Sequence, residues 1–509
     1  MEDATNDLAC PRCGAALATL ACSGCGARWE TVLGVPFIGD FEAADALGLI
    51  EIAANAPNRA TLAHPPGTVE RLDALCAAYH ASPDKAAFKA AHEEARAFYF
   101  DNRYHEWLAV EMLLEGHDLA GRDVLDIGAG QGFDAKRLAL RGGRVTALEF
   151  SPILAEAGQQ AFPEIRWIGG FSHALPFADA SFDDVFINAA LHHMRDIPTA
   201  IAEALRVLRP GGTLITTGDP FRADAAGQDL EFDVFDRHEA VLLGINEQIP
   251  PLSAFLLTLE RNRGILDIGL FTDTLHGNPA GNGRDLKAWT AWDFDRDAAM
   301  LRRRSGGLSM RIRLKAPWPH PRAVQRAGVL APATFASWLD DPEGAIAHLA
   351  RIMPAELADT PFPGPPAKFD LINGWRVARS TTATRTAFRR GRLFLTRTPQ
   401  HARLHYEIRS ATPAAFAFKV NARPVGTLEV GTDWTPAAID VSGVPPGDIF
   451  VLEFARLGKA AQFDDACFTV RLPGATEVPQ QVEAIVPHPS LSRRIAGLLG
   501  RLGLRRPAH

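Results

Sequence analysis

Between residues 121 and 220, short apolar runs alternate with stretches of helical periodicity. The runs with strand character are Val124–Ile127, Arg144–Glu149, Asp184–Asn188 and Thr216–Asp219. Short strands that alternate with helical segments are typical of βαβ units, in which helices cover a parallel sheet. The pattern therefore predicts an α/β domain built on a mostly parallel sheet.

Residues 370–475 follow a different pattern, in which apolar and polar positions alternate one by one. The alternation is clearest in Arg403–Ile408, Phe416–Val420 and Ile449–Phe454, and turn-forming residues such as Pro445–Asp448 separate these runs. Short strands at a spacing of roughly 10–15 residues predict an antiparallel β-sandwich.

The remaining patterns divide the chain into five predicted segments. A cysteine-bearing ribbon comes first, an Ala-rich helical lead-in or cap follows it, and a breaker-rich run at Pro361–Pro366 separates the α/β domain from the sandwich. The last segment is a basic tail with amphipathic spacing. The predicted boundaries are 1–40, 41–120, 121–365, 370–475 and 476–509.

Composition excludes several classes of protein. Of the 509 residues, 47% are hydrophobic and 22% are charged, as in a globular protein rather than a disordered one. No run approaches the ~20 apolar residues of a membrane span. The acidic start of the chain lacks the basic and apolar regions of a secretion signal, which predicts a cytoplasmic protein. The net charge of −7 makes nucleic acid an unlikely partner.

Four of the six cysteines lie within the first 25 residues. Cys10, Cys13, Cys22 and Cys25 form two C-x-x-C pairs, each followed directly by glycine. Such a turn points two thiolates at one ion, and two turns complete the tetrahedral site that suits Zn²⁺. The spacing predicts a structural zinc site, and a redox-active cysteine pair is the alternative.

The role of this zinc ribbon is open to two interpretations. Residues 1–50 contain two arginines against seven acidic residues, whereas phosphate binding relies on Lys and Arg. A structural or protein-docking role is therefore favoured over contact with RNA.

A glycine-rich turn follows the first predicted strand of the α/β domain. Gly128, Gly130 and Gly132 form G-x-G-x-G ahead of a helical stretch, which allows a ligand to lie against bare backbone at a helix N-terminus. The next strand ends at Glu149, 23 residues after Asp126. An acid in this place can accept hydrogen bonds from both hydroxyls of a ribose.

Five sequence blocks between residues 121 and 217 resemble class I S-adenosylmethionine (SAM)-dependent methyltransferases of the type 11 group. The order and spacing of these blocks are specific to that group, although they cover about 100 of the 509 residues. The blocks are Val124–Gly132, Leu148–Pro152, Leu175–Asp183, Leu191–His193 and Glu203–Gly212.

The resemblance implies a Rossmann-like fold and roles for individual residues. Asp126 would lie near the methionine part of SAM, the glycines would allow the cofactor to approach, Glu149 would hold the ribose and Phe150 would flank the adenine. Asn188 would shape the edge of the cofactor site.

One position departs from the pattern of the family, which often carries an acid that meets the adenine amine. Here Phe171 stands in its place. Phe171 would stack on the adenine, or Ser172 would hydrogen-bond to it. Weak cofactor binding by a non-catalytic, methyltransferase-like assembly factor is the third interpretation.

A hydroxyl acceptor needs a base, and three residues are candidates. His192 and His193 follow the fourth strand, and Asp219 ends the next one, at the sheet edge where ligands bind. Packing of a loop is the alternative for the histidines. Trp289, Trp292, Asp293 and His276 would either line an acceptor pocket or pack in the core.

The predicted function is methyl transfer to a small-molecule or glycan-linked acceptor, with a sugar oxygen as the expected target. The sandwich resembles, loosely, modules that accompany enzymes of surface-polysaccharide assembly, and it would recognise a glycan or mediate protein contacts. An rRNA or tRNA methyltransferase guided by the ribbon is the main rival. The tail at 490–506 carries five arginines and no acid, which predicts peripheral contact with an anionic inner membrane face or, alternatively, a partner-bound or frayed segment.

Overall fold

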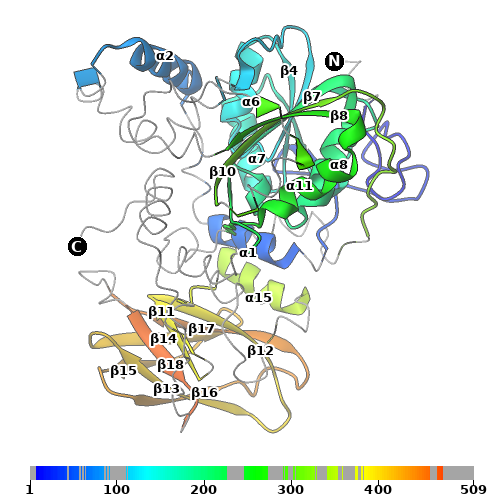
Figure 1. Ribbon diagram of the computed structural model, residues 1–509. Coiled ribbons are helices and arrows are strands. Elements are labelled where there is room, and N and C mark those ends of the chain that lie inside the picture. The colour runs from blue at the N-terminus through cyan, green and yellow to red at the C-terminus, as the bar shows by residue number, and fades with distance from the viewer. Residues whose placement is uncertain are drawn as a thin grey trace.

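The computed structural model shows a central α/β domain with the cysteine-bearing segment docked on it, and a separate β-sandwich (Figure 1). This arrangement confirms the predicted fold class. The structure describes residues 7–42, 45–56, 59, 62, 65–84, 87–88, 91, 110–111, 113–225, 246–272, 290–291, 293–295, 302–303, 305–326, 328, 337, 341–352, 358, 373–376, 380–381, 383–458 and 467–473.

Within the described residues, the central sheet has ten strands in the order β1-β2-β5-β4-β3-β6-β7-β10-β8-β9. Neighbours from β2 to β7 are parallel, and the remaining pairs are antiparallel. The strands are β1 (Glu30–Val32), β2 (Val35–Phe37), β3 (Asp123–Ile127), β4 (Arg144–Glu149), β5 (Arg166–Gly169), β6 (Phe182–Asn188), β7 (Leu208–Phe221), β8 (Leu266–Thr272), β9 (Thr290–Ala291) and β10 (Gly306–Leu314).

Two layers of helices cover this sheet. In β3, Val124 packs with α6 and α7 on one face, whereas Leu125 and Ile127 pack with α8 and α11 on the other. A strand buried on both faces has no solvent-facing side, which is why β3 is apolar apart from Asp123 at its start and the buried Asp126. The helices are α6 (Phe133–Leu140), α7 (Pro152–Ala161), α8 (Ile197–Val207) and α11 (Leu252–Arg261), with short 3₁₀ turns η4 (Ser172–Ala174), η5 (Leu191–His193) and η6 (Arg263–Ile265).

The cysteine-bearing segment is joined to the edge of the central sheet. Phe37 in β2 pairs with Gly169 in β5, and a β-bridge links Leu8 to Phe177. A side chain at position 169 would overlap the Phe37 ring, because a Cβ atom there would lie 2.2 Å from it. The glycine therefore allows β2 to lie flat on the sheet edge, beside the strand that leads into the η4 loop.

A helical layer lies between the central domain and the sandwich (Figure 1). Helix α15 (Pro342–Ile352) contacts both α1 (Ala46–Asn55) and strand β17 of the sandwich. Leu49 of α1, Leu349 of α15 and Val451 of β17 belong to one buried apolar cluster. Helix α2 (Thr68–Ala81) contacts α6 instead.

The sandwich consists of two four-stranded antiparallel sheets, β11-β18-β13-β16 and β12-β17-β14-β15. Trp375, Tyr406 and Phe454 are fully buried between them and meet edge to face. All three strand runs expected from the alternation are present, within β13, β14 and β17. The bounds are β11 (Thr384–Phe388), β12 (Arg390–Thr396), β13 (Arg403–Ser410), β14 (Ala414–Val420), β15 (Arg423–Val430), β16 (Thr435–Asp440), β17 (Ile449–Arg456) and β18 (Cys467–Arg471).

Several predicted features lie outside the described residues. These are the breaker run 361–366, the tail 476–509, and three of the four residues considered for an acceptor pocket: His276, Trp289 and Trp292. None of the described helices has the length and hydropathy that crossing a membrane requires.

Candidate active site

A cavity of about 590 Å³ opens at the carboxyl ends of β3, β4 and β6. The glycine-rich turn forms its floor, the segments after β4, β5 and β6 form its walls, and residues 45–51 at the start of α1 cover it. In parallel α/β sheets ligands bind at this edge, because the strand ends and the helix N-termini face it. The predicted site residues are therefore close together in space.

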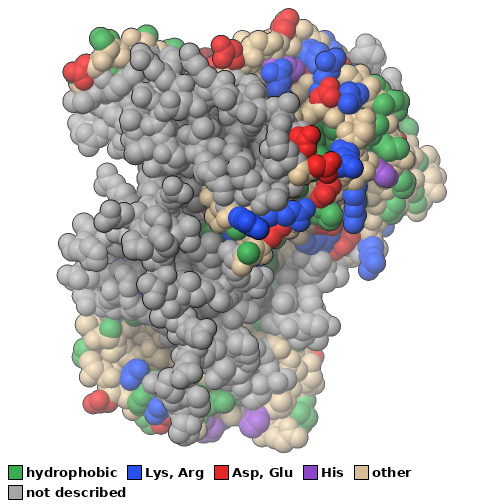
Figure 2. Space-filling model, in the orientation of Figure 1, with side chains coloured by type: hydrophobic (Ala, Val, Ile, Leu, Met, Phe, Trp, Pro, Cys, Tyr) green, Lys and Arg blue, Asp and Glu red, His purple; other side chains and the backbone are tan. Residues whose placement is uncertain are grey.

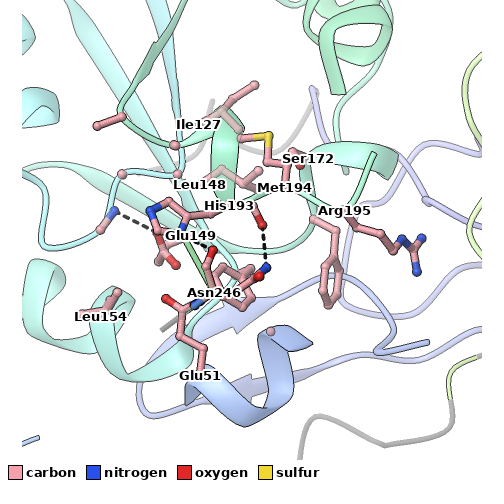
Figure 3. A pocket seen from close by; sticks show the side chains of 18 of the residues that line it. Glu51, Ile127, Leu148, Glu149, Leu154, Ser172, His193, Met194, Arg195 and Asn246 are labelled. Atoms are coloured by element: carbon pink, nitrogen blue, oxygen red, sulfur yellow. Dashed lines mark hydrogen bonds between the residues drawn. The ribbon is translucent and has the colours of Figure 1, made fainter. Parts of the chain in front are cut away.

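Glu149 fixes the shape of the cavity floor. Its carboxylate accepts a hydrogen bond of 2.8 Å from the main-chain amide of Gly130 (Figure 3) and another of 2.8 Å from that of Ser151. Burial raises the pKa of Glu149, and the amide hydrogen bonds oppose this effect. The side chain thus ties the end of β4 to the glycine-rich turn while it lines the cavity.

The three glycines of the turn have different surroundings. A Cβ atom on Gly130, which has φ +54°, would meet nothing within 4 Å, so this residue presents bare backbone to the cavity. A Cβ on Gly128 would lie 2.6 Å from the Ala190 side chain. Gly132 does not line the cavity, because a Cβ there would meet the ring of Trp167 at 2.7 Å. Close packing explains Gly128 and Gly132, whereas Gly130 leaves room for a ligand.

Two buried polar atoms at the cavity floor have no protein partner. They are Oδ2 of Asp126 and Oδ1 of Asn188. Asp126 lies just below the cavity lining, and its burial raises its pKa well above the ordinary value. Asn188 lines the cavity and donates to Asp134 at 2.7 Å. Unsatisfied buried acceptors are costly, so these two oxygens mark polar groups at or just beneath the cavity floor that the protein itself leaves without a donor.

Aromatic side chains form the wall beside α1. Phe150 contacts Gly48 of α1, where a Cβ atom would lie 3.1 Å from the ring. Phe171 lines the cavity, and its ring packs edge to face against Phe41 and Phe37, with centroids 4.7 and 5.9 Å away. Phe171 thus completes an apolar cluster with Phe37 and Phe41, in the segment that precedes α1. Ser172 also lines the cavity.

Beyond these aromatic residues, the cavity is polar. His193, Asn246 and Glu247 line this end, and Glu51 projects toward them from α1 (Figure 3). The main-chain N–H of Asn246 donates to the Glu51 carboxylate at 3.3 Å. Burial raises the pKa of Glu51 to about 8. A carboxyl group with such a pKa can exchange a proton near neutral pH.

His192 lies behind the cavity wall, between two acids. Its Nδ1 is 2.9 Å from Asp219 and its Nε2 is 3.2 Å from Glu247. Burial by itself would lower the pKa of His192, but these two hydrogen bonds outweigh it and raise the pKa to about 10. Of the three candidate bases, only His193 lines the cavity; His192 and Asp219 are buried beside it.

The comparison with known families agrees with this geometry. Residues 125–216, which contain the floor and the walls of the cavity, match the family described as methyltransferase domain. This part of the chain has the Rossmann-like fold of a class I methyltransferase domain.

Relatives of the methyltransferase domain include enzymes named for quinone biosynthesis. A demethylmenaquinone methyltransferase from Renibacterium salmoninarum is 42% identical over 108 residues, which span 20% of this chain and 46% of the relative. A ubiquinone/menaquinone biosynthesis C-methyltransferase from Paracoccus denitrificans is 42% identical over 104 residues, 19% of this chain and 41% of the relative. The chain thus spans less than half the length of these relatives.

Solved structures of methyltransferases are also similar. One is an S-adenosylmethionine-dependent methyltransferase from Mesorhizobium loti, with 18% sequence identity and a TM-score of 0.30, covering 41% of this chain and 97% of that chain.

Sequence reasoning did not single out several residues of the methyltransferase domain's cavity. Glu51 and Asp45 belong to a helical segment expected only as a cap, and Asp134 follows the glycine-rich turn by two positions. Glu247 lies in the stretch 246–249 before α11, which carries no motif of its own. These residues are far apart along the chain, so no local sequence pattern connects them.

The cysteine cluster has the geometry expected for a metal. The four Sγ atoms lie within 4.8 Å of one another, with 3.6 Å between Cys10 and Cys25 and 3.4 Å between Cys13 and Cys22. A tetrahedron with Zn–S bonds of about 2.3 Å has S–S distances of about 3.8 Å. The cluster is therefore compatible with Zn²⁺.

Proposed function

We propose that the chain is a SAM-dependent methyltransferase. The observation that carries this proposal is the cavity floor, where Glu149 holds the Gly130 turn whose backbone is open to the cavity, with the buried, partly unpartnered carboxyl group of Asp126 close by. SAM, when bound, supplies a methyl group already activated on a sulfonium. Glu149 would accept the ribose hydroxyls, Asp126 would face the methionine part, and Phe150 would flank the adenine.

The residues at the polar end would bind and deprotonate the acceptor. The acceptor oxygen would take the methyl group that SAM supplies, the bonding electrons would stay with the sulfur of SAM, and the proton of the acceptor would pass to a residue of this end. Glu51 and Nε2 of His193 are the proton acceptors that line this end. Helix α1 lies over the cavity and would exclude water, which competes with the acceptor.

A hydroxyl-bearing acceptor suits this end better than a wholly apolar one. Glu51, Asn246, Glu247 and Gln248 all line the cavity there, and unsatisfied polar groups would oppose an apolar ligand. The expected sugar or glycan-linked acceptor, methylated on oxygen, is consistent with this chemistry and remains a prediction. Transfer to carbon is the second candidate, because the relatives with 42% identity are named for quinone methylation.

Two further expectations concern what the chain binds: the acceptor, and a zinc ion in the ribbon. On the face drawn in Figure 2, acidic and basic side chains interleave over the described part of the methyltransferase domain. Arg195 of this domain pairs with both Glu42 and Asp45. Such a surface supports a small-molecule acceptor over RNA. The four cysteines would hold a structural zinc ion that keeps the ribbon folded against the sheet edge.

Calorimetric titration with SAM and S-adenosylhomocysteine tests the cofactor site. Gly130→Leu would fill the open space above the turn and should abolish binding. Gly211→Leu is the matched control, because Gly211 also has a positive φ and open space around a Cβ atom but lies away from the cavity. No binding by the folded, zinc-loaded wild-type protein would refute the proposal.

The acceptor is identified by transfer from SAM carrying a ¹³C-labelled methyl group. Panels of sugars, glycans and quinols would be incubated with the protein, and NMR would show whether the new methyl group is on oxygen or on carbon. A C–CH₃ product would replace the sugar-oxygen expectation with the second candidate.

A further inference from the structure

Two histidines and a glutamate converge at the polar end of the cavity. His192, His193 and Glu247 each place one ligand atom within 4.8 Å of the others. They come from two segments that are far apart in sequence, the η5 turn and the stretch before α11. Two imidazoles and one carboxylate form a common ligand set for divalent transition metals.

The hydrogen bonds behind this cluster orient both imidazole rings. His193 Nδ1 lies 3.0 Å from the main-chain oxygen of Asn246, which can only accept, so Nδ1 is the donor. His192 Nδ1 donates to the Asp219 carboxylate at 2.9 Å. In His193, Nε2 is therefore the nitrogen that offers a lone pair. In His192, Nε2 donates to Glu247 and would offer a lone pair to a metal ion that displaces this proton. Metal-binding histidines almost always have such an oxygen partner on the other ring nitrogen.

The distances also suit an ion. Nε2 of His192 and Oε2 of Glu247 are 3.2 Å apart. Two ligand atoms at about 2.1 Å from one metal are about 3.0–3.4 Å apart when the angle between the bonds is 90–109°. A metal ion would bridge this pair without a large movement of either side chain.

The local charge favours a cation. Asp219 and Glu247 flank His192, and the buried Glu51 lies close enough to interact with both Glu247 and His192. Three carboxyl groups thus surround one imidazole in a region of low solvent access. A buried excess of negative charge is costly unless a proton or a metal ion compensates it.

We propose that His192, His193 and Glu247 bind a divalent first-row transition-metal ion at the acceptor end of the cavity. His193 and Glu247 line the cavity, so the ion would have open positions toward it. Two hydroxyl or carbonyl oxygens of the acceptor would occupy these positions, a role that rests on the proposed methyltransferase function. The metal would then orient the acceptor, and Glu51 would remain as the base for its proton.

Cobalt(II) added to the zinc-loaded full-length protein tests this site. We expect one Co²⁺ per chain by calorimetry, with weak d–d absorption and without the intense thiolate charge-transfer bands that replacement of zinc in the cysteine cluster would produce. Glu247→Gln and His193→Gln should each weaken Co²⁺ binding on the order of 100-fold. Glu260→Gln and His320→Gln, which change the same residue types outside the cavity, should leave it unchanged.

A second readout uses the wild-type protein alone and does not depend on the folding of the variants. Bound Co²⁺ should shift the NMR signals of two imidazole rings strongly. Absence of Co²⁺ binding outside the cysteine cluster, or binding that all the variants retain, would overturn the proposal.

Titration of the same samples with SAM separates the two proposals. Binding of SAM without Co²⁺ would refute the metal site alone. Binding of Co²⁺ without SAM would refute the proposed methyltransferase function and leave a metal site of another use.

Discussion

The hydrogen bonds of Glu149 allow a quantitative test of the cavity floor. In Glu149→Gln the side chain keeps one acceptor oxygen and gains an NH₂ group, so the amides of Gly130 and Ser151 can no longer both be satisfied. A buried donor left without a partner costs about 1–3 kcal/mol in the free energy of unfolding. Removal of a buried charge offsets part of this cost, since burial raises the pKa of Glu149. The loss of stability should therefore be small.

The affinity for SAM should change more. A hydrogen bond from a ribose hydroxyl to a carboxylate contributes about 1.5–3 kcal/mol. At about 1.4 kcal/mol per factor of ten, its loss raises the Kd roughly 10–150-fold. Calorimetry with SAM measures this change, and thermal unfolding without ligand confirms that the variant is folded.

Glu164→Gln is the matched control for this prediction. Glu164 is half exposed and pairs with Lys136 at 2.7 Å on the surface, away from the cavity. The Glu164→Gln variant should bind SAM as tightly as the wild type does. A Kd for Glu149→Gln within twofold of the wild-type value, in a folded protein, would show that Glu149 shapes the turn without contacting the cofactor.

Three further predictions concern stability. Cys22→Ser should remove the bound zinc and lower the melting temperature; metal analysis checks the first effect, and an unchanged zinc content would contradict the assigned ligand set. Gly158→Ala should destabilise the protein by about 1–3 kcal/mol in urea unfolding, because a Cβ atom would lie 2.1 Å from the Trp167 ring. Gly264→Ala is the control: a Cβ atom there meets open space, so this variant should be as stable as the wild type or more stable. Burial raises the pKa of Asp45 to about 6 from an ordinary 3.8, so ionising this carboxyl destabilises the fold as the pH rises through that interval. Asp45→Asn should therefore gain stability relative to the wild type between pH 4 and pH 7, by up to about 3 kcal/mol, and a difference that does not vary with pH would contradict this assignment.

The sequence was most informative where a structural element is defined by near neighbours. The strand predicted at Arg144–Glu149 is β4 itself, and the turn after β3 was evident from its glycines. The alternation in the last third of the chain also predicted two sheets of antiparallel strands. These features are local, because strand periodicity and turn chemistry depend on residues a few positions apart.

Several features of the site were decided only by tertiary structure. Sequence spacing put His192, His193 and Asp219 at one sheet edge, but packing determined that only His193 lines the cavity while the other two are buried beside it. The cover of the cavity by α1 depends on apolar contacts that join Phe171 to residues of the N-terminal segment.

The acceptor end of the cavity shows most clearly what sequence patterns cannot predict. Glu51 and Glu247 are almost 200 positions apart, yet they interact in the fold. No period or motif relates them, because their proximity depends on how α1 and the segment before α11 pack against the same sheet edge. The sequence alone therefore determined the elements and the cofactor turn, whereas tertiary packing determined which charged groups meet the acceptor.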